Sequence, residues 1–269
     1  MAMPLDLRAH LLAGQVIPAL PLALQRNRRW DETRQRALVR YYVDAGAGGL
    51  AVGVHSTQFA IRDRKIALYR PVLQLAAETA TAWIGRKKRP FVLIAGLCGR
   101  TPQALAEARI ARSLGYHAGL LSLGAWADAT EATVLAHCRA VAKEIPLVGF
   151  YLQPAVGGRV FSYRFWRQFA EIPSLVAVKI APFHRYRTID VVRAVIGAGR
   201  TDVALYTGND DTIVTDLLTP FGPAGRPRFI VGGLLGQWGV WTERAVALLE
   251  EIKRARAGRG LTLSPRPPP

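Results

Sequence analysis

The chain has 269 residues, 50% of them hydrophobic, a length that fits one large domain such as a (β/α)8 barrel or two small domains. Its net charge is +17, but the Arg and Lys residues are mostly scattered and no DNA- or RNA-binding motif accompanies them. The charge therefore favours a generally basic surface over a nucleic-acid partner.

The longest apolar stretch also excludes a membrane anchor. Leu11–Leu24 is interrupted by Gln15 and two prolines, so it is too short and too broken to span a bilayer, and it makes a poor signal peptide. The cysteines, Cys98 and Cys138, lie far apart without the spacing of a metal site. We therefore expect a protein of the reducing cytoplasm without a disulfide scaffold.

Apolar runs alternate with helical patterns along the chain. Predicted strands cover Gly14–Leu20, Gly48–Val54, Phe91–Leu97, His117–Leu123, Pro146–Leu152, Leu175–Ala181, Val203–Thr207 and Arg228–Gly232. Predicted helices cover Trp30–Val43, Tyr69–Ile84, a segment beginning at Thr101, Thr130–Lys143, Tyr163–Ala170, Thr188–Ile196, Asp210–Leu218 and Trp241–Ala255. We expect Asp31 and Thr101 to cap their helices.

Eight strand and helix pairs in alternation predict a (β/α)8 barrel, which we place at residues 1–257. The rival architecture is an open doubly wound sheet, but the first strand is followed by Leu20-Pro21-Leu22 instead of a glycine-rich turn. The later Val231–Gly236 segment resembles a dinucleotide-binding glycine loop only loosely. We expect residues 258–269, which end in Pro-Arg-Pro-Pro-Pro, to form a disordered tail.

One lysine interrupts the apolar run of the sixth predicted strand, Leu175–Ala181. Burial penalises the charged form of a lysine and lowers its pKa, so a buried lysine usually has a partner or a task. A neutral amine is a nucleophile that can form a Schiff base with a carbonyl substrate. The alternative is that Lys179 ends the strand and extends to water. In a barrel the chemistry lies at the C-terminal ends of the strands, where we place Lys179.

Tyr151 is the second candidate, near the end of the fifth predicted strand. Because strands five and six are neighbours in a barrel, we expect its phenol to lie close to the amine of Lys179. A hydroxyl at that position can move protons on and off a carbinolamine. The alternative is a core aromatic residue whose hydroxyl finds a backbone partner.

Four segments occur in an order and spacing that carry a family resemblance. They read Val54-His55-Ser56-Thr57-Gln58, Gly149-Phe150-Tyr151, Val176-Ala177-Val178-Lys179 and Tyr206-Thr207-Gly208-Asn209-Asp210. Together they resemble the dihydrodipicolinate synthase and N-acetylneuraminate lyase superfamily over nearly the whole chain. The resemblance implies a (β/α)8 barrel in which Lys179 forms a Schiff base with pyruvate or another 2-oxo acid, while Tyr151 relays protons.

The same resemblance assigns substrate-binding roles. The family motif Gly-Thr-Thr-Gly-Glu holds the 2-oxo acid carboxylate, and its counterpart here loses both glycines, which leaves Val54, His55 and Ser56. Gly208 is expected to let the backbone approach the substrate. The alternatives are a hydrogen-bonded wall residue for His55 and an ordinary turn residue for Gly208. His184, just past the sixth strand, is a weaker candidate.

Two departures from the family pattern argue against the lysine-pathway synthase. The loop after strand four, Ser122–Trp126, lacks the second tyrosine of that enzyme's relay, and Arg159 is not where the synthase places an arginine for its aldehyde. We therefore expect a lyase, aldolase or dehydratase with a different and more apolar second substrate. Trp126, Gln153 and Trp238 are candidate lining residues, with loop packing as the alternative.

The C-terminal part departs as well. Members of the family continue into further helices, whereas here Trp241–Ala255 is followed by the short proline-rich tail. We expect most of that extension to be missing, and the apolar surface thus exposed to support a homo-oligomer.

The partner implied by the resemblance is a small 2-oxo acid. No metal or cofactor is expected, because the protonated imine is itself the electron sink and no zinc-type spacing is present. Two other hypotheses stay open, namely a catalytically weakened barrel that serves as a binding or scaffold protein and a basic nucleic-acid-associated protein.

Overall fold

In the computed structural model, which describes residues 5–223 and 227–258, eight parallel strands form one sheet in the order β1-β8-β7-β6-β5-β4-β3-β2. The strands are β1 (Val16–Pro18), β2 (Gly49–Val52), β3 (Val92–Leu97), β4 (Ala118–Leu121), β5 (Leu147–Leu152), β6 (Leu175–Ala181), β7 (Ala204–Thr207) and β8 (Gly232–Leu235). The sheet closes on itself where the Gly48 amide donates to the Val16 carbonyl at 3.0 Å and the Leu20 amide to the Ala51 carbonyl at 2.9 Å. The predicted (β/α)8 barrel is confirmed.

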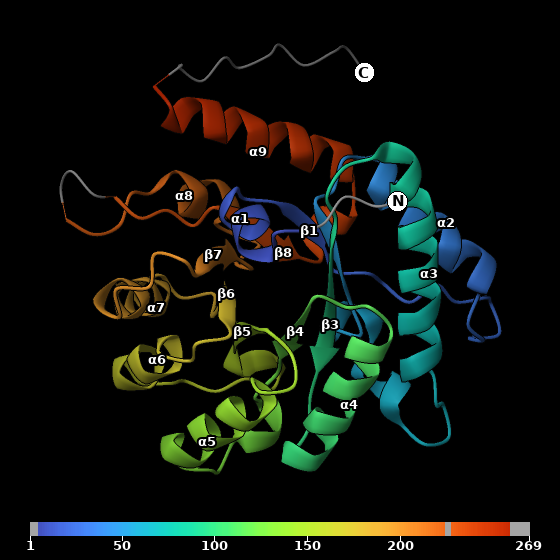
Figure 1. Cartoon of the computed structure of the whole chain (residues 1–269), viewed down its shortest axis with the longest axis horizontal. Coiled ribbons are helices and arrows are strands. Elements are labelled where there is room, and N and C mark those ends of the chain that lie inside the picture. Colours follow the sequence, from blue (N-terminus) through green and yellow to red (C-terminus); the bar gives the residue numbers. More distant parts are fainter. Residues whose placement is uncertain (1–4, 224–226, 259–269) are drawn as a thin grey trace.

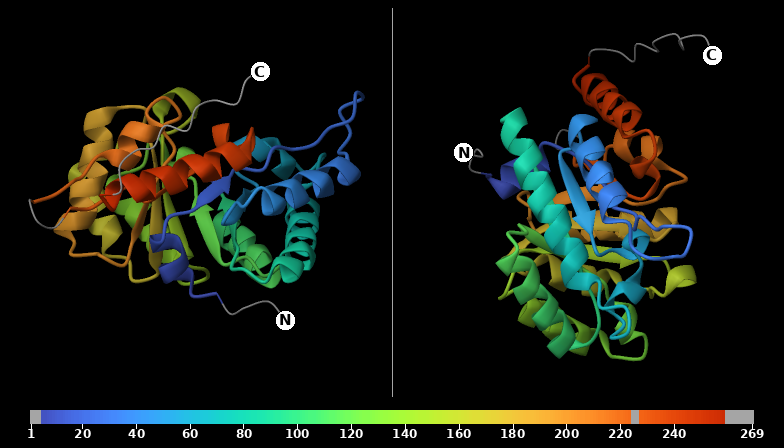
Figure 2. Two further views of the ribbon diagram at one scale, coloured as in Figure 1. Left: turned by 90° about the horizontal axis from the view of Figure 1, so that it is seen from above. Right: turned by 90° about the vertical axis from the view of Figure 1, so that its right-hand side faces the viewer.

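Each strand is followed by a helix, and these helices lie outside the ring of strands (Figures 1 and 2). They are α2 (Glu32–Asp44), α3 (Tyr69–Lys87), α4 (Thr101–Ser113), α5 (Glu131–Val141), α6 (Tyr163–Ala170), α7 (Arg185–Gly197), α8 (Ile213–Leu218) and α9 (Thr242–Arg256). No helix of the described residues is long and apolar enough to cross a membrane.

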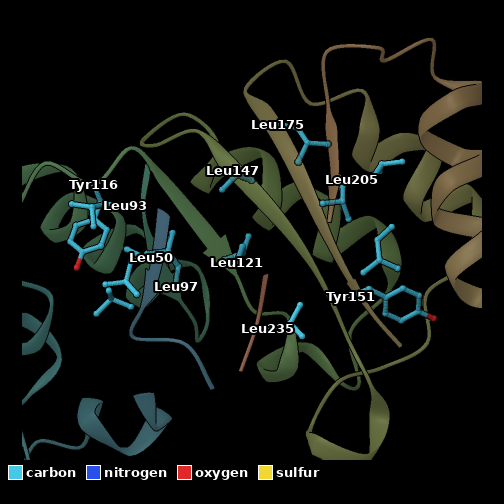
Figure 3. Packing of buried hydrophobic residues seen from close by; sticks show 14 of the residues in the cluster. Leu50, Leu93, Leu97, Tyr116, Leu121, Leu147, Tyr151, Leu175, Leu205 and Leu235 are labelled. Atoms are coloured by element: carbon cyan, nitrogen blue, oxygen red, sulfur yellow. The ribbon is translucent and has the colours of Figure 1, made fainter. Parts of the chain in front are cut away.

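Successive strand side chains face alternately the barrel axis and the helices, so the molecule has two apolar layers. The interior layer is formed by residues that include Ile17, Ala51, Ile94, Leu120, Val148, Phe150, Val176, Tyr206 and Leu234. The outer layer, between strands and helices, includes Leu50, Leu93, Leu97, Tyr116, Leu121, Leu147, Tyr151, Leu175, Leu205 and Leu235 (Figure 3). The face on which a strand residue lies therefore decides whether it can reach the barrel axis.

A short helix that the sequence did not predict covers the N-terminal end of the barrel. This α1 (Leu7–Leu12) buries Leu11 in the interior layer, and the Leu11 carbonyl accepts a hydrogen bond from the Tyr206 hydroxyl at 2.8 Å. This helix packs against β6 and β7 (Figure 1). With this end covered, the opposite rim is the one left for a site.

Two local predictions about helix caps have different outcomes. The Asp31 carboxylate accepts the Arg34 amide at 2.9 Å, so the predicted cap of α2 is confirmed. The predicted cap of α4 is wrong, because Arg100 occupies the capping position and Thr101 is the first helical residue. The Thr101 hydroxyl instead pairs with Nδ1 of His137 at 2.9 Å.

The eighth strand lies later in the chain than predicted. The predicted segment Arg228–Gly232 overlaps β8 only at Gly232, because Arg228 forms an isolated antiparallel bridge with Phe221. Two glycines can occupy β8 because there is no room beside them for side chains: a Cβ on Gly233 would lie 2.5 Å from the Trp238 ring. The Val231–Gly236 segment, which loosely resembles a dinucleotide-binding glycine loop, thus contains the barrel strand β8. The predicted tail, residues 258–269, lies outside the described residues except for Gly258.

Candidate functional site: a buried lysine at the C-terminal rim

A cavity of about 190 Å³ opens at the C-terminal ends of the strands. Lys179 of β6 lines it, together with four residues predicted from the sequence, Val54, His55, Ser56 and Gly208. The structure therefore brings together five of the six predicted site residues, from the ends of β2, β6 and β7.

A one-residue irregularity in β6 turns Lys179 toward the cavity. Leu147 pairs with Leu175, but the next residue, Val148, pairs with Ala177, so Val176 is an extra residue in β6. Val176 and Ala177 both join the interior layer. Because side chains alternate along a strand, a regular β6 would have pointed Lys179 at the helices; β-bulges commonly re-aim a side chain in this way near active sites.

The amine of Lys179 is buried without a polar partner. The residue is 9% exposed, and no described residue forms a hydrogen bond or ion pair with its Nζ. Burial lowers the pKa of Lys179 from 10.5 to about 8, and the charge of Asp210 offsets part of this decrease. The Nζ lies 4.5 Å from the centroid of the Phe150 ring. Among the described residues, this ring is the only direct contact that stabilises the charged form of the amine. A substantial neutral fraction makes this amine a nucleophile at ordinary pH.

Gly208 makes room for the lysine stem. A Cβ on Gly208 would lie 2.7 Å from Lys179 Cε and 2.8 Å from Ala181 Cβ, well inside van der Waals contact. The position of the amine therefore requires a glycine at the end of β7, so Gly208 is not an ordinary turn residue.

We expect Gly208→Ala to slow imine formation at Lys179 roughly 10²-fold, the scale of a displacement of about 1 Å at a reacting atom. Borohydride trapping with a 2-oxo acid measures this rate, and circular dichroism verifies the fold. Gly85→Ala in α3 is the matched control, because a Cβ at Gly85 would meet nothing within 4 Å. An unchanged trapping rate in Gly208→Ala would show that the Lys179 side chain can keep its amine in the cavity despite a β-carbon at position 208.

The short turn after β2 carries His55 and Ser56. Thr57 holds this turn, since its hydroxyl accepts the Gly53 amide at 3.0 Å and donates to the Leu20 carbonyl at 2.6 Å. His55 is exposed and its ring lies 5.7 Å from that of Phe59. The imidazole and the Ser56 hydroxyl are the polar side chains that this turn presents to the cavity.

A buried ion pair secures the same turn from behind. Arg62 Nε contacts Glu107 at 2.9 Å, and its Nη2 donates to the carbonyls of Gly53 and Gly96, which follow β2 and lie in β3. The Glu107 carboxylate also accepts the Cys98 amide at 3.0 Å. Burial raises the pKa of the Cys98 thiol to about 11, so this cysteine is not a nucleophile at neutral pH.

The loop after β7 is fixed by a second polar network. The Asn209 amide donates to Asp216 at 2.9 Å, and its carbonyl oxygen accepts the Phe183 amide at 2.9 Å. Asp216, fully buried, also accepts from the Thr207 hydroxyl and from Arg185. These contacts fix the backbone on both sides of Gly208 and thereby place Asp210 at the mouth of the lysine cavity.

The expected position of Tyr151 is wrong. In the β5–β6 register Phe150 pairs with Lys179, whereas Tyr151 pairs with Ile180 and belongs to the outer layer (Figure 3). The Tyr151 ring lies 5.0 Å from that of Trp166, and burial raises the pKa of its phenol, an effect that the backbone of Phe161 reduces. The hydroxyl therefore lies on the wrong face of the strand to reach the amine.

Of the weaker candidates, only Gln153 lines the lysine cavity. Trp126 is buried against His137, and Trp238 fills the space beside Gly233, so both serve loop packing. His184 occupies the cap position of α7. Arg159 donates hydrogen bonds to the carbonyls of Trp126 and Ala129 at 2.8 and 2.6 Å.

Sequence reasoning missed two features of the site. Asp210 stood in a quoted motif but received no role, although its place past the end of β7 is the signal that marks site residues in barrels. The ion pair between Arg62 and Glu107 had no signal, because 45 residues separate its members and neither interrupts a strand. The apolar wall that Phe150 and Leu152 supply follows from strand alternation once the register is known.

Fold and site together define a (β/α)8 barrel with a buried lysine at the end of strand six. Solved structures with this fold include dihydrodipicolinate synthase from Agrobacterium tumefaciens, with a TM-score of 0.74, 21% identity and coverage of 94% of this chain and 78% of that one. N-acetylneuraminate lyase from Fusobacterium nucleatum gives a TM-score of 0.73 at 16% identity and covers 92% of this chain and 78% of its own.

A third structure is a prophage protein of the dihydrodipicolinic acid synthase family from E. coli K12 in complex with pyruvate. Its TM-score is 0.74 at 16% identity, over 91% of this chain and 76% of that one. As expected, these chains are longer than the present one. No family model matches, and the search of curated proteins gives no significant match. At these identities the likeness establishes the fold.

Proposed function

We propose that the protein is a Schiff-base lyase of the dihydrodipicolinate synthase and N-acetylneuraminate lyase type, acting on pyruvate or another small 2-oxo acid. The observation that carries this proposal is the unpaired amine of Lys179 in a cavity at the C-terminal rim, with its pKa lowered by burial to about 8. The structural likeness to a pyruvate-bound protein supports it.

In the proposed reaction the neutral amine attacks the ketone carbon, a C–N bond forms, and the carbonyl electron pair moves to oxygen. Proton transfer from nitrogen to oxygen gives the carbinolamine, whose hydroxyl takes up a further proton and leaves as water, so that a protonated imine remains. That imine withdraws electrons from the neighbouring carbon, so a C–C or C–O bond at the next position can break or form. Water then releases the product and restores the amine. Ser56, His55 and the backbone beside Val54 hold the carboxylate.

The second substrate is proposed to be uncharged or apolar where it meets the cavity. Phe150, Leu152, Val156, Phe183 and Leu235 form much of the lining. Among the described lining residues there is no arginine to hold a second carboxylate, and Arg159 is engaged with backbone carbonyls. The lysine-pathway reaction is therefore not the one proposed.

The test is incubation with pyruvate, 2-oxobutyrate or 2-oxoglutarate and sodium borohydride, followed by peptide mass mapping. We expect a reduced adduct at Lys179 alone, at a rate that rises about tenfold per pH unit below pH 8 and then levels off, because only the neutral amine attacks. Protein treated with borohydride alone is the control. No adduct with any of the acids would favour the second candidate, a barrel that binds ligands without catalysis, as the turned-away Tyr151 suggests.

Several expectations from the sequence stay predictions. These are the homo-oligomer, a reducing cytoplasmic location, and chemistry that uses no cofactor or metal. Exposed apolar side chains beside α9, namely Val240 at 57% and Trp241 at 75% exposure, support self-association.

A further inference from the structure

The cavity holds few groups that could move protons. Among the described residues that line it, the titratable side chains are Lys179, His55 and Asp210. Lys179 is consumed as the nucleophile, and Tyr151 lies in the outer layer. The proton carrier must therefore be His55, Asp210 or a water molecule.

We propose that the carboxyl group of Asp210 is the acid and base of this site, taking the place that a tyrosine holds in the family the sequence resembles. This inference rests on the proposed Schiff-base function. Its geometric basis is that Asp210 lines the same cavity as Lys179 and lies two residues after Gly208, in the loop that follows β7, the strand next to β6.

The carboxyl and the amine interact without forming an ion pair. Each affects the pKa of the other, yet no oxygen of Asp210 lies within 4.0 Å of Nζ. Both groups line the same cavity, so a bound substrate can contact each of them. The absence of a direct ion pair leaves the amine free to lose its proton.

Asp210 has the properties of a proton carrier. Partial desolvation raises the pKa of its carboxyl, while Lys179 and the backbone of Gln237 act in the opposite direction. The residue is exposed at the rim, so its carboxyl can exchange protons with water. The residue also lines a second hollow of about 390 Å³ beside α8 and α9, so it lies where the lysine cavity meets that hollow. His55, by contrast, lies across the ring at the end of β2, on the turn assigned to the carboxylate.

Each proton transfer has a defined source and destination. The protonated carboxyl gives its proton to the carbinolamine hydroxyl, the C–O bond breaks, and water leaves as the nitrogen lone pair forms C=N. The resulting carboxylate removes a proton from C3, and that C–H electron pair forms the enamine. When the enamine carbon attacks an aldehyde, the new alkoxide takes the proton from Asp210, which ends as the carboxylate. Hydrolysis of the final imine reverses the first steps.

The C3 proton transfer can be measured without knowing the second substrate. Wild-type protein is incubated with pyruvate in D₂O, and deuterium entry at C3 is followed by NMR beside borohydride trapping at Lys179. We expect Asp210→Asn to keep trapping at Lys179 while exchange slows about 10²-fold or more, the scale of a positioned acid-base group. Asp128→Asn is the control, because this exposed carboxylate does not line the lysine cavity, and its exchange should match wild type.

The outcomes separate this inference from the proposed function. If wild type traps and exchanges but Asp210→Asn exchanges as fast, the role of Asp210 is disproved and the Schiff-base function stands. If His55→Gln alone loses exchange, the histidine is the carrier and the inference is wrong. If wild type gives no adduct at Lys179, both the proposed Schiff-base function and the role of Asp210 are disproved.

Discussion

Lys179→Met should abolish borohydride trapping and at the same time raise the stability of the barrel. Methionine has a similar length but no charge to desolvate, and the pKa of Lys179 falls from 10.5 to about 8 because of that desolvation. A shift of this size corresponds to roughly 3 kcal/mol, of which we expect about 1–3 kcal/mol to appear as added stability at pH 7 once the lost contact with Phe150 is included. Urea unfolding measures the change.

The pH dependence of that gain has a definite sign. The unfolded lysine is charged up to about 10.5, while the folded one loses its proton above about 8, so the penalty is fully present below pH 8 and decreases between these values. The advantage of Lys179→Met should shrink over the same interval. Lys253→Met, at a lysine paired with Glu250 on the surface, is the control and should change stability little. A destabilised Lys179→Met protein would identify a structural lysine, and retained trapping would place the nucleophile elsewhere.

Glu107→Ala is expected to destabilise the protein by about 3–5 kcal/mol, because it leaves the Arg62 guanidinium buried without its counter-charge. The side chains of Arg62 and Glu107 are only 9% and 7% exposed. Thermal and urea unfolding provide the measurement. Glu144→Ala breaks exposed pairs with Arg109 and Arg112 and should cost less than about 1 kcal/mol.

A double variant separates the buried charge from the packing. Arg62→Met with Glu107→Met removes both charges, so it should recover part of the loss seen in Glu107→Ala. The recovery is incomplete because the carbonyls of Gly53 and Gly96 lose their donor. If Glu107→Ala costs no more than Glu144→Ala, the ion pair does not carry the stability assigned to it.

The barrel could be predicted because each strand and helix has its own local sequence pattern and because the strand and helix pair repeats along the chain. β6 matched its predicted range in full, since an apolar run of this length is a strong strand signal. Arg228–Gly232 failed as a strand because the crowding that admits glycines into β8 comes from Gln15, which is remote in sequence, and from Trp238 in the loop that follows the strand.

The residue types of the site could be predicted from the sequence, but the face of the strand on which each side chain lies could not. Lys179 stood out as a charge in an apolar run, and the family motif gave its spacing to Tyr151. Spacing alone does not state on which side of a strand a residue lies. The bulge at Val176 turns Lys179 inward, whereas the regular alternation of β5 turns Phe150 inward and Tyr151 outward. A bulge is a tertiary feature with no sequence signal in this run.

The turn that carries His55 and Ser56 also bears on how tightly a small molecule can bind. A pyruvate-sized ligand has few atoms, each contributing at most about 1.5 kcal/mol, so it cannot order a flexible loop and still bind well. Here Thr57 and Arg62 already anchor Gly53 through hydrogen bonds, so the turn is ordered before a ligand arrives. The conformational entropy of the turn is lost when the chain folds, and the contact energy of the ligand remains available for affinity.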